Sequence, residues 1–537
     1  MSTIETDSTM TRRILLPFVA LAVGALTLAG CDSFLEPEPE SFQTSTTFYN
    51  TPDQVGQAVN GAYTQMRGLF GSGQYRNLVE RRGPTLTKDF DVNLPNTVAG
   101  SPQTDEWTMT VDNDQSEVLW QLTYDLVKEA NVILAQIEGV EFQDQARKTR
   151  LRGEARTMRA LAYWFAAQAW GDVPLILEPA QGPSEAIPDG RAPRQEVYSQ
   201  VISDLTSVVE NGALPVSYSG DDVGRITDGA ARFLLGRTYL LTEEYENALT
   251  QFEALDDGRY QLLDDHRQIF NPSNKNNEET ILELQYDPSI TGQGSWGVYN
   301  EILPITATKE DLIPSASSGF IPQGNIMPTP DIIQTFEDGD ERVDAYLAWH
   351  EHPENRNSPE IAWPVRTPTR APGDSVAYLY KYYWPGQVDS QGNGLNNWVM
   401  FRFADVLLSA AEAHWRLGQN TQAQQYLNRV RNRAGLDDYD PAEFSSFLTS
   451  GATGDPLGDA ILHERAVELL GEGHFWFDLK RFGPDVARKV FEPYAARYRE
   501  RDPRASADDF VFQEHKLLYP VPTREIDLAG LSQNSGW

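Results

Sequence analysis

The chain has 537 residues and a single cysteine, Cys31. One cysteine excludes an intramolecular disulfide framework and any metal site built from several thiolates, so stability has to come from packing. Basic residues are also scarce, with 44 Lys and Arg against 78 Asp and Glu, and the formal net charge is −34. A charge of this sign and size repels phosphate backbones, so we expect no nucleic-acid partner.

Long hydrophobic runs are lacking except for one near the N-terminus, from Ile14 to Leu26. Arg12 and Arg13 precede it, and the small residues before Cys31 follow it, which is the order of a secretory signal peptide. The run is shorter than the roughly 20 apolar residues that span a bilayer, although a short membrane anchor with an unrelated thiol is the alternative interpretation. We therefore predict a signal peptide over residues 1–30 and no other membrane-embedded segment.

The end of this run, Leu28-Ala-Gly-Cys31, resembles the lipobox of bacterial lipoproteins. In a lipobox the cysteine sulfur receives a diacylglyceryl group and the cysteine becomes the new N-terminus. Residues 31–45 are rich in Pro and Glu and read as an extended, acidic tether. We expect an outer-membrane lipoprotein, lipidated at Cys31 and facing the cell exterior. Asp32 leaves the leaflet open, because some bacteria read an aspartate there as a retention signal.

The rest of the chain carries aromatic residues at 11%, including 12 Trp, which indicates a folded protein. Hydrophobic spacing predicts that helices predominate, and the region 256–400, rich in Pro, Gly, Asn and aromatic residues, is predicted to be mostly non-helical. The predicted helices cover 118–137, 147–170, 193–211, 227–255, 401–417, 421–434 and 459–470.

Within 229–255, small and large residues occupy the positions that a tetratricopeptide repeat assigns to leucine, glycine, tyrosine, alanine and phenylalanine. They are Leu235, Gly236, Tyr239, Ala248 and Phe252. A weaker copy uses Ala411, His414, Ala423 and Leu427, and a third begins at Ala160 and Tyr163. We predict a mainly α fold, a tetratricopeptide-like scaffold of helical hairpins with an irregular, aromatic-rich loop insertion that carries the ligand site. The alternative is an ordinary helical bundle with chance matches.

Motifs along the whole chain resemble the SusD/RagB family of nutrient-binding lipoproteins. They include Trp170-Gly-Asp-Val-Pro174, Gly224-Arg-Ile-Thr227, Tyr426-Leu-Asn-Arg-Val-Arg431, His463-Glu-Arg465, Gly471-Glu-Gly473, Phe477-Asp-Leu-Lys-Arg-Phe-Gly483 and Gln533-Asn-Ser-Gly-Trp537. The resemblance implies capture of a glycan, or sometimes a peptide, at the cell surface without chemistry on the ligand and without a cofactor. It also implies a SusC-like TonB-dependent transporter as partner.

The resemblance divides the chain after the tether into a helical region 46–255, the insertion 256–400 and a helical region 401–537, which we expect to form one fold. Several motif residues have a structural explanation. Glu464 and Arg465, with Asp478 and Arg481, are predicted to form a partly buried ion-pair network.

A sugar ring has apolar C–H faces ringed by hydroxyls, so its sites combine aromatic platforms with planar polar side chains. Two stretches offer both, the insertion and the loop region 71–110, which the family often uses for ligand contact. Packing of these aromatic residues in the core is the alternative for each one. The ligand-binding candidates are Trp296, Tyr299, Trp349, Trp363, Tyr383, Trp384, Trp398, Arg81, Asn93 and Trp107.

Catalytic and metal-binding motifs are missing. No Gly-x-Ser-x-Gly and no His-Glu-x-x-His occurs, and His350-Glu-His352 lacks the helical spacing that brings two imidazoles to one metal. Asp338-Gly-Asp-Glu341 is more simply a charged turn than a calcium loop. We therefore predict no catalytic residue and no metal. The functional alternatives are a tetratricopeptide-type lipoprotein scaffold for a protein partner and, less favoured, a surface glycoside hydrolase.

Overall fold

A computed structural model describes residues 48–87, 107–180, 182, 190–286, 327–351, 375–382, 384, 395–501 and 510–537. For residues 348–351, 375, 376, 378 and 501 it describes the backbone alone. The chain divides into two units, Met1–Asn50 and Thr51–Trp537, and the following account concerns the second unit. Among the described residues, none of the helices combines the length and the apolarity that crossing a membrane requires.

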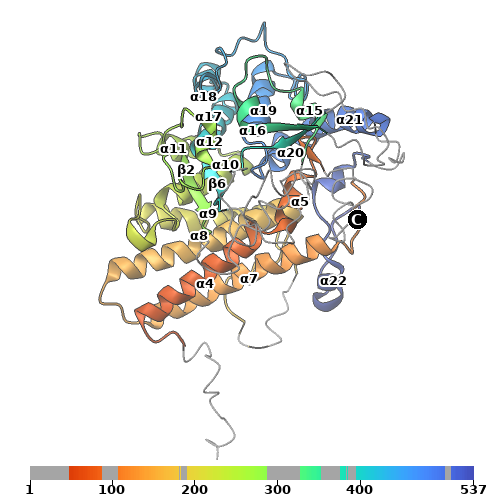
Figure 1. The fold of residues 1–537 in the computed structure, drawn as a ribbon. Helices are drawn as coiled ribbons and strands as arrows, with labels where there is room; N and C mark the ends of the chain where they lie inside the picture. Colours follow the sequence, from red (N-terminus) through yellow and green to blue (C-terminus); the bar gives the residue numbers. More distant parts are fainter. Residues whose placement is uncertain are drawn as a thin grey trace, which may run out of the picture. The chain divides into compact units, whose positions relative to one another are not determined.

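Three long helices lie side by side at the start of this unit (Figure 1): α4 (Pro52–Phe70), α7 (Asp114–Gln136) and α8 (Gln145–Trp170). Thr51 begins α4 with a capping box, in which its side chain and that of Gln54 satisfy each other's backbone N–H groups. Gly171, at φ +78°, ends α8, as the glycine and the nearby Pro174 predict. The predicted helices 118–137 and 147–170 are therefore confirmed.

The predicted helical hairpins are present. α8 packs on α9 (Arg194–Glu210), α10 (Asp228–Leu241) on α11 (Tyr245–Glu253), and α17 (Phe403–Arg416) on α18 (Asn420–Arg433). In the second hairpin a Cβ on Gly236 would lie 2.5 Å from Cε1 of Phe252, so only glycine permits this approach of the two helices. The tetratricopeptide-like helical fold is confirmed.

The remaining helices are shorter or lie in the C-terminal half. They are α5 (Gly73–Glu80), α12 (His266–Ile269), α15 (Pro330–Ile333), α16 (Arg342–Tyr346), α19 (Pro456–Glu468), α20 (Phe475–Phe482), α21 (Pro484–Arg501) and α22 (Thr523–Ala529). Strands are short and pair two by two in antiparallel fashion. β1 (Leu86–Thr87) pairs with β3 (Met327–Pro328), β2 (Thr280–Leu284) with β6 (Trp398–Arg402), and β4 (Leu347–Glu351) with β5 (Ser375–Leu379).

Ion pairs run through the core of the C-terminal half. The predicted network is present, because Asp478 accepts from both Arg465 and Arg481, each at 2.8 Å. Two details differ from the expectation. Arg465 and Asp478 are fully buried, and Glu464 pairs with Arg342 on α16 and not with this group. A second set of ion pairs surrounds the equally buried Arg402, which binds Glu279, Glu468 and Glu472.

Candidate functional site

Three segments that carry predicted ligand-binding residues, 88–106, 287–326 and 352–374, lie outside the described residues. The residues that border them are placed. In the β1–β3 pair, Leu86 lies opposite Pro328 and Thr87 opposite Met327. In the β4–β5 pair, Glu351 lies opposite Ser375. The N-terminal loop region and the aromatic insertion, which are far apart in sequence, are therefore joined by direct strand pairing.

Further contacts link these borders into one cluster. β3 contacts β5, and Tyr382, just after β5, stacks on Trp398 with ring centroids 5.4 Å apart and planes at 18°. The neighbour of Trp398, Asn397, accepts a hydrogen bond from the backbone N–H of Tyr286 at 2.9 Å. We call residues 86–87, 327–328, 375–382 and 397–398 the loop-anchor cluster. Both stretches that the sequence proposed for ligand binding thus start from this cluster.

Three of the predicted ligand contacts are buried supports of this region. Trp398 is 1% exposed, stacked on Tyr382 and covered by the guanidinium of Arg76. Trp107 is also 1% exposed, and its indole N–H donates to the Arg82 carbonyl at 2.9 Å. Arg81, 1% exposed, donates to Asn77 Oδ1. Because none of them presents a surface to solvent, their assignment as ligand contacts is corrected to packing in the interior.

Trp384 is still a candidate for ligand binding, because its side chain is only half-buried and lies next to the loop-anchor cluster. The guanidinium carbon of Arg267 lies 4.6 Å from the Trp384 ring centroid and 4.0 Å from that of Tyr380. An arginine held between two aromatic rings combines a planar polar group with apolar faces. Of the other candidates, Trp349 has its backbone in β4, opposite Ala377, and its side chain is not described. Trp296, Tyr299, Trp363, Tyr383, Asn93 and the lipidation site Cys31 lie outside the described residues.

Lys381 fastens the cluster from beneath, a role that the sequence did not reveal. Its side chain is fully buried, and Nζ donates to the Leu470 carbonyl and to Glu472, both at 2.7 Å. Burial lowers the pKa of Lys381 to about 8, against the opposing effect of Glu472. The motif Gly471-Glu-Gly473 was the available signal, since Gly471, at φ +75°, leaves room for Leu379 at the end of β5.

Glu80, at the end of α5, reaches the same turn. One of its carboxylate oxygens accepts a hydrogen bond from the backbone N–H of Gly473. Burial raises the pKa of Glu80 to about 8, although this hydrogen bond and the charge of Lys381 act in the opposite direction. The helix that leads into β1 and the residue that follows β5 by two positions are therefore both bonded to the turn 470–473, which keeps the loop borders together.

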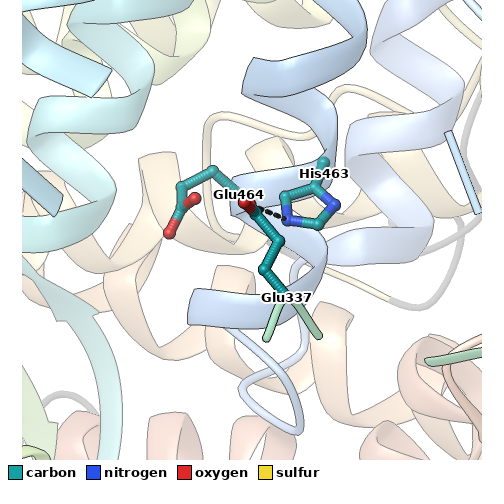
Figure 2. Close-up of side chains that lie close together, drawn as sticks. All are labelled: Glu337, His463 and Glu464. Atoms are coloured by element: carbon teal, nitrogen blue, oxygen red, sulfur yellow. Dashed lines mark ion pairs between the residues drawn. The ribbon is translucent and has the colours of Figure 1, made fainter. Parts of the chain in front are cut away.

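Among the described residues, one group has metal-ligand types in close range: Glu337, His463 and Glu464 (Figure 2). His463 Nε2 lies 3.3 Å from Glu337 Oε1. A cation is already supplied by Arg431, whose Nη1 lies 2.6 Å from Glu337 Oε1 and 3.6 Å from Glu464 Oε2. Burial alone would raise the pKa of Glu337, but hydrogen bonds from His463 and Arg431 outweigh it and hold this pKa well below its usual range. The group is an ion-pair cluster that joins helices.

The charged stretch 338–341 also has a structural explanation. Both carboxylate oxygens of Asp340 accept hydrogen bonds from Arg342, at 2.9 and 2.8 Å. Asp340 is 5% exposed, so it is not available to an ion from solvent. This supports the interpretation of the stretch as a charged turn.

Comparison with known proteins agrees with this architecture. A family model described as the SusD family matches residues 267–537, and one described as "Starch-binding associating with outer membrane" matches residues 33–240. The chain belongs to the SusD family. The resemblance predicted from its motifs is therefore confirmed.

Particular relatives span nearly the whole chain. SusD-like protein P25 from Formosa agariphila is 26% identical over 541 residues, which cover 93% of this chain and 94% of that protein. A SusD-like protein from Bacteroides ovatus is 26% identical and covers 90% of this chain and 85% of its own length.

Solved structures share the fold. A SusD superfamily protein from Parabacteroides distasonis superposes with a TM-score of 0.70 at 23% identity, covering 92% of this chain and all of that one. A laminarin binding SusD-like protein gives 0.68 at 23% identity, and surface glycan-binding protein A from Bacteroides thetaiotaomicron gives 0.69 at 20%; each covers 91% of this chain and all of its own.

Proposed function

We propose that this protein is an outer-membrane lipoprotein, anchored through Cys31 and facing the cell exterior. It captures an oligomeric nutrient, in the first place a glycan, and delivers it uncleaved to a SusC-like TonB-dependent transporter. The observation that carries this proposal is the match of two SusD-type family models to both halves of the chain, one of them described as starch-binding and associated with the outer membrane. The name of the laminarin binding fold neighbour supports a glycan as ligand.

The arrangement of the described residues supports a ligand site on the loops that start from the loop-anchor cluster. This cluster joins loops from two halves of the sequence and is fastened to the helical scaffold by Lys381 and Glu80. Such support holds the described borders of these segments together before a ligand binds, which limits the entropy lost on binding. Trp384, stacked on Arg267 beside the cluster, is the candidate platform for a sugar ring.

A glycan array followed by calorimetry, on the soluble form that begins at Asp32, tests ligand capture. We expect saturable binding of at least one glycan, and at least tenfold weaker binding for Trp384→Ala, because the ring stacks on the sugar. Trp537→Ala is the matched control, since Trp537 is also half-buried but lies at the C-terminus, against His515. An equal loss of affinity in both variants contradicts the site at Trp384. Absence of glycan binding by the parent protein contradicts the function.

Delivery is tested in cells. Cys31→Ala leaves the folded domain unchanged and removes the lipid, so the tethered concentration beside a transporter is lost. We expect normal glycan binding by the purified variant, reduced uptake of labelled glycan by cells, and no cleavage products in either case. Unchanged uptake contradicts the role of the anchor, and released products contradict a purely binding function.

A further inference from the structure

Two clefts lie on either side of Gly224. The larger, about 610 Å³, lies between α4 and the end of β2. The smaller, about 410 Å³, lies between the segment 216–227 and residues 276–283. Both clefts are lined by Val223, Gly224, Arg225 and Glu283, and no residue of the loop-anchor cluster lines either of them. They therefore adjoin each other. The larger cleft also reaches the edge of the cluster, because Asn397 donates to Glu283 and Gln285 and accepts from the Tyr286 N–H, but the cluster itself is not part of the lining.

The boundary between the two clefts is polar. Gly224 has φ +93°, and a Cβ there would lie 2.4 Å from Cδ of Gln285, so the amide of Gln285 rests directly on the glycine. Gln285 and Asn276 exchange two amide hydrogen bonds across this point, at 2.8 and 3.0 Å. A glycine and two amides thus lie at the boundary that the two clefts share. We call the two clefts together the Gly224 groove.

The groove is lined by the side-chain types that recognise hydroxylated rings. Aromatic rings and carboxamides both line it, and they are Tyr63, Tyr218, Tyr260, Tyr286, Asn60, Asn276, Asn277 and Gln285. Some of these amides already bond within the protein: Asn277 donates to two backbone carbonyls, and Asn60 accepts from Arg225. Two of the five large hydrophobic side chains exposed among the described residues also line it, Val216 at 61% and Val223 at 46%. Apolar faces beside planar amides match the C–H faces and hydroxyls of a sugar.

The charged residues of the groove favour an uncharged ligand. Arg225 is engaged by Glu154 at 2.8 Å and by Asp222 at 2.6 Å. Lys275 donates to the Tyr286 carbonyl at 2.8 Å, and Arg259 pairs with Asp257 at 2.7 Å. The fourth cation of the lining, Arg67, lies over the Tyr286 ring, 5.7 Å from its centroid. Because these cations are engaged internally, an acidic sugar gains little from them and meets Asp221 and Glu278 in the same lining.

We infer that the Gly224 groove is a second carbohydrate site, which binds an uncharged oligosaccharide separately from the loops on the loop-anchor cluster. The inference rests on the proposed function in that the ligand is a glycan. It adds a site on the repeat scaffold itself, formed by α4, the segment 216–227 and β2.

Steric blocking tests the groove, with controls that match the local bonding of each substituted residue. Thr64→Trp fills the larger cleft and Ser217→Trp the smaller one, and both residues are exposed. Thr250→Trp is the matched control for the first: both threonines are exposed on helices, and each hydroxyl donates to the carbonyl four residues earlier. Ser219→Trp is the control for the second, since Ser219 is exposed two residues away and lines neither cleft.

The probes are five uncharged hexasaccharides: maltohexaose, laminarihexaose, cellohexaose, xylohexaose and mannohexaose. Calorimetry gives affinity and stoichiometry, and hydrogen–deuterium exchange with a bound probe locates the contact. We expect at least one probe to protect residues 216–227 and 275–286, and both groove variants to weaken that binding at least tenfold. Trp384→Ala and both control variants should retain it.

Two results overturn the inference: no binding of any of the five probes, or groove variants with parental affinity, stoichiometry and protection. Binding that is lost in Trp384→Ala and kept in both groove variants supports the proposed function and overturns the second site. Binding that is kept in Trp384→Ala and lost in the groove variants supports the second site and also supports glycan capture, because the proposed function fails only when no glycan binds the parent protein. The failure of one proposal is therefore distinguishable from the failure of the other.

Discussion

Replacement of Arg402 by methionine tests whether the buried ion pairs hold the C-terminal half together. Arg402 is 0% exposed and makes five hydrogen bonds. They reach the carboxylates of Glu279, Glu468 and Glu472 and the backbone carbonyl of Glu468, at 2.6 to 2.9 Å. Methionine keeps most of the side-chain length but removes the charge and every donor. The variant therefore leaves three carboxylates in a dry interior with one cation fewer.

The loss of stability in Arg402→Met depends on which cations still pair with the three carboxylates. Glu279 and Glu468 keep Arg433, and Glu472 keeps Lys381, so no carboxylate loses its last partner. Removal of one partner costs about 3–5 kcal/mol of unfolding free energy when it leaves a buried charge uncompensated. Because each carboxylate here keeps a cation, we expect Arg402→Met to lose at most this amount and clearly more than an exposed pair would.

Arg429→Met is the matched control. Arg429 also makes a two-point contact with a carboxylate, at 2.6 and 2.9 Å from the two oxygens of Asp256, but its side chain is 42% exposed. An exposed pair of this kind contributes about 0–1 kcal/mol, because water and salt screen it. Both substitutions thus remove an arginine–carboxylate contact, one from a buried site and one from an exposed site.

Urea unfolding followed by tryptophan fluorescence measures both variants against the parent protein. With an unchanged slope, the shift in midpoint gives the change in unfolding free energy. The reasoning is refuted if Arg402→Met loses no more stability than Arg429→Met. It is also refuted if Arg402→Met is the more stable of the two, since the ion pairs would then be dispensable to the fold.

Two further stability predictions concern a hairpin and a buried acid. Gly236→Ala should lose about 1–3 kcal/mol in the same assay, because the new methyl overlaps the Phe252 ring. Gly68→Ala, on an open face of α4 with its nearest contact at 4.0 Å, should be neutral or gain up to about 1 kcal/mol; equal losses would contradict the repeat packing. The pKa of Glu80 is raised from 4.5 to about 8, so between these values the folded protein holds a proton that the unfolded chain has released. Its contribution to stability is full below pH 4.5 and is lost as the pH rises to 8. The unfolding free energy of Glu80→Gln, relative to that of the parent protein, should therefore increase as the pH rises from 4.5 to 8. A difference between the two that does not change with pH would contradict this.

Elements with strong local signals were predictable. The helices α8 and α17, and the approach of α10 to α11 at Gly236, follow from periodicity and from the need for a small residue where two helices meet. Helix α4 was missed, although Thr51, Pro52 and Gln54 carry its capping signal. Helix α5 is short, and its buried polar residues, including Arg76 and Glu80, obscure the hydrophobic pattern.

The candidate site shows where prediction from sequence stops. Trp107, Trp398 and Trp384 are the same residue type in similarly irregular surroundings, yet two are fully buried and one is half-buried. Composition cannot separate them, because burial depends on which partners arrive from elsewhere in the chain. Phe491 and Trp476 cover Trp107, and Tyr382 and Arg76 cover Trp398.

The repeat scaffold and the family follow from the chain alone, since each depends on residues that are close together in sequence or in fixed order. The pairing of β1 with β3, and the convergence of Lys381 and Glu80 on the same turn, emerge only in the folded protein. The same is true of Gly224, which lies under Gln285 between two clefts. These contacts join residues that are distant in sequence, and no local pattern specifies them, because each exists only once the helices have packed.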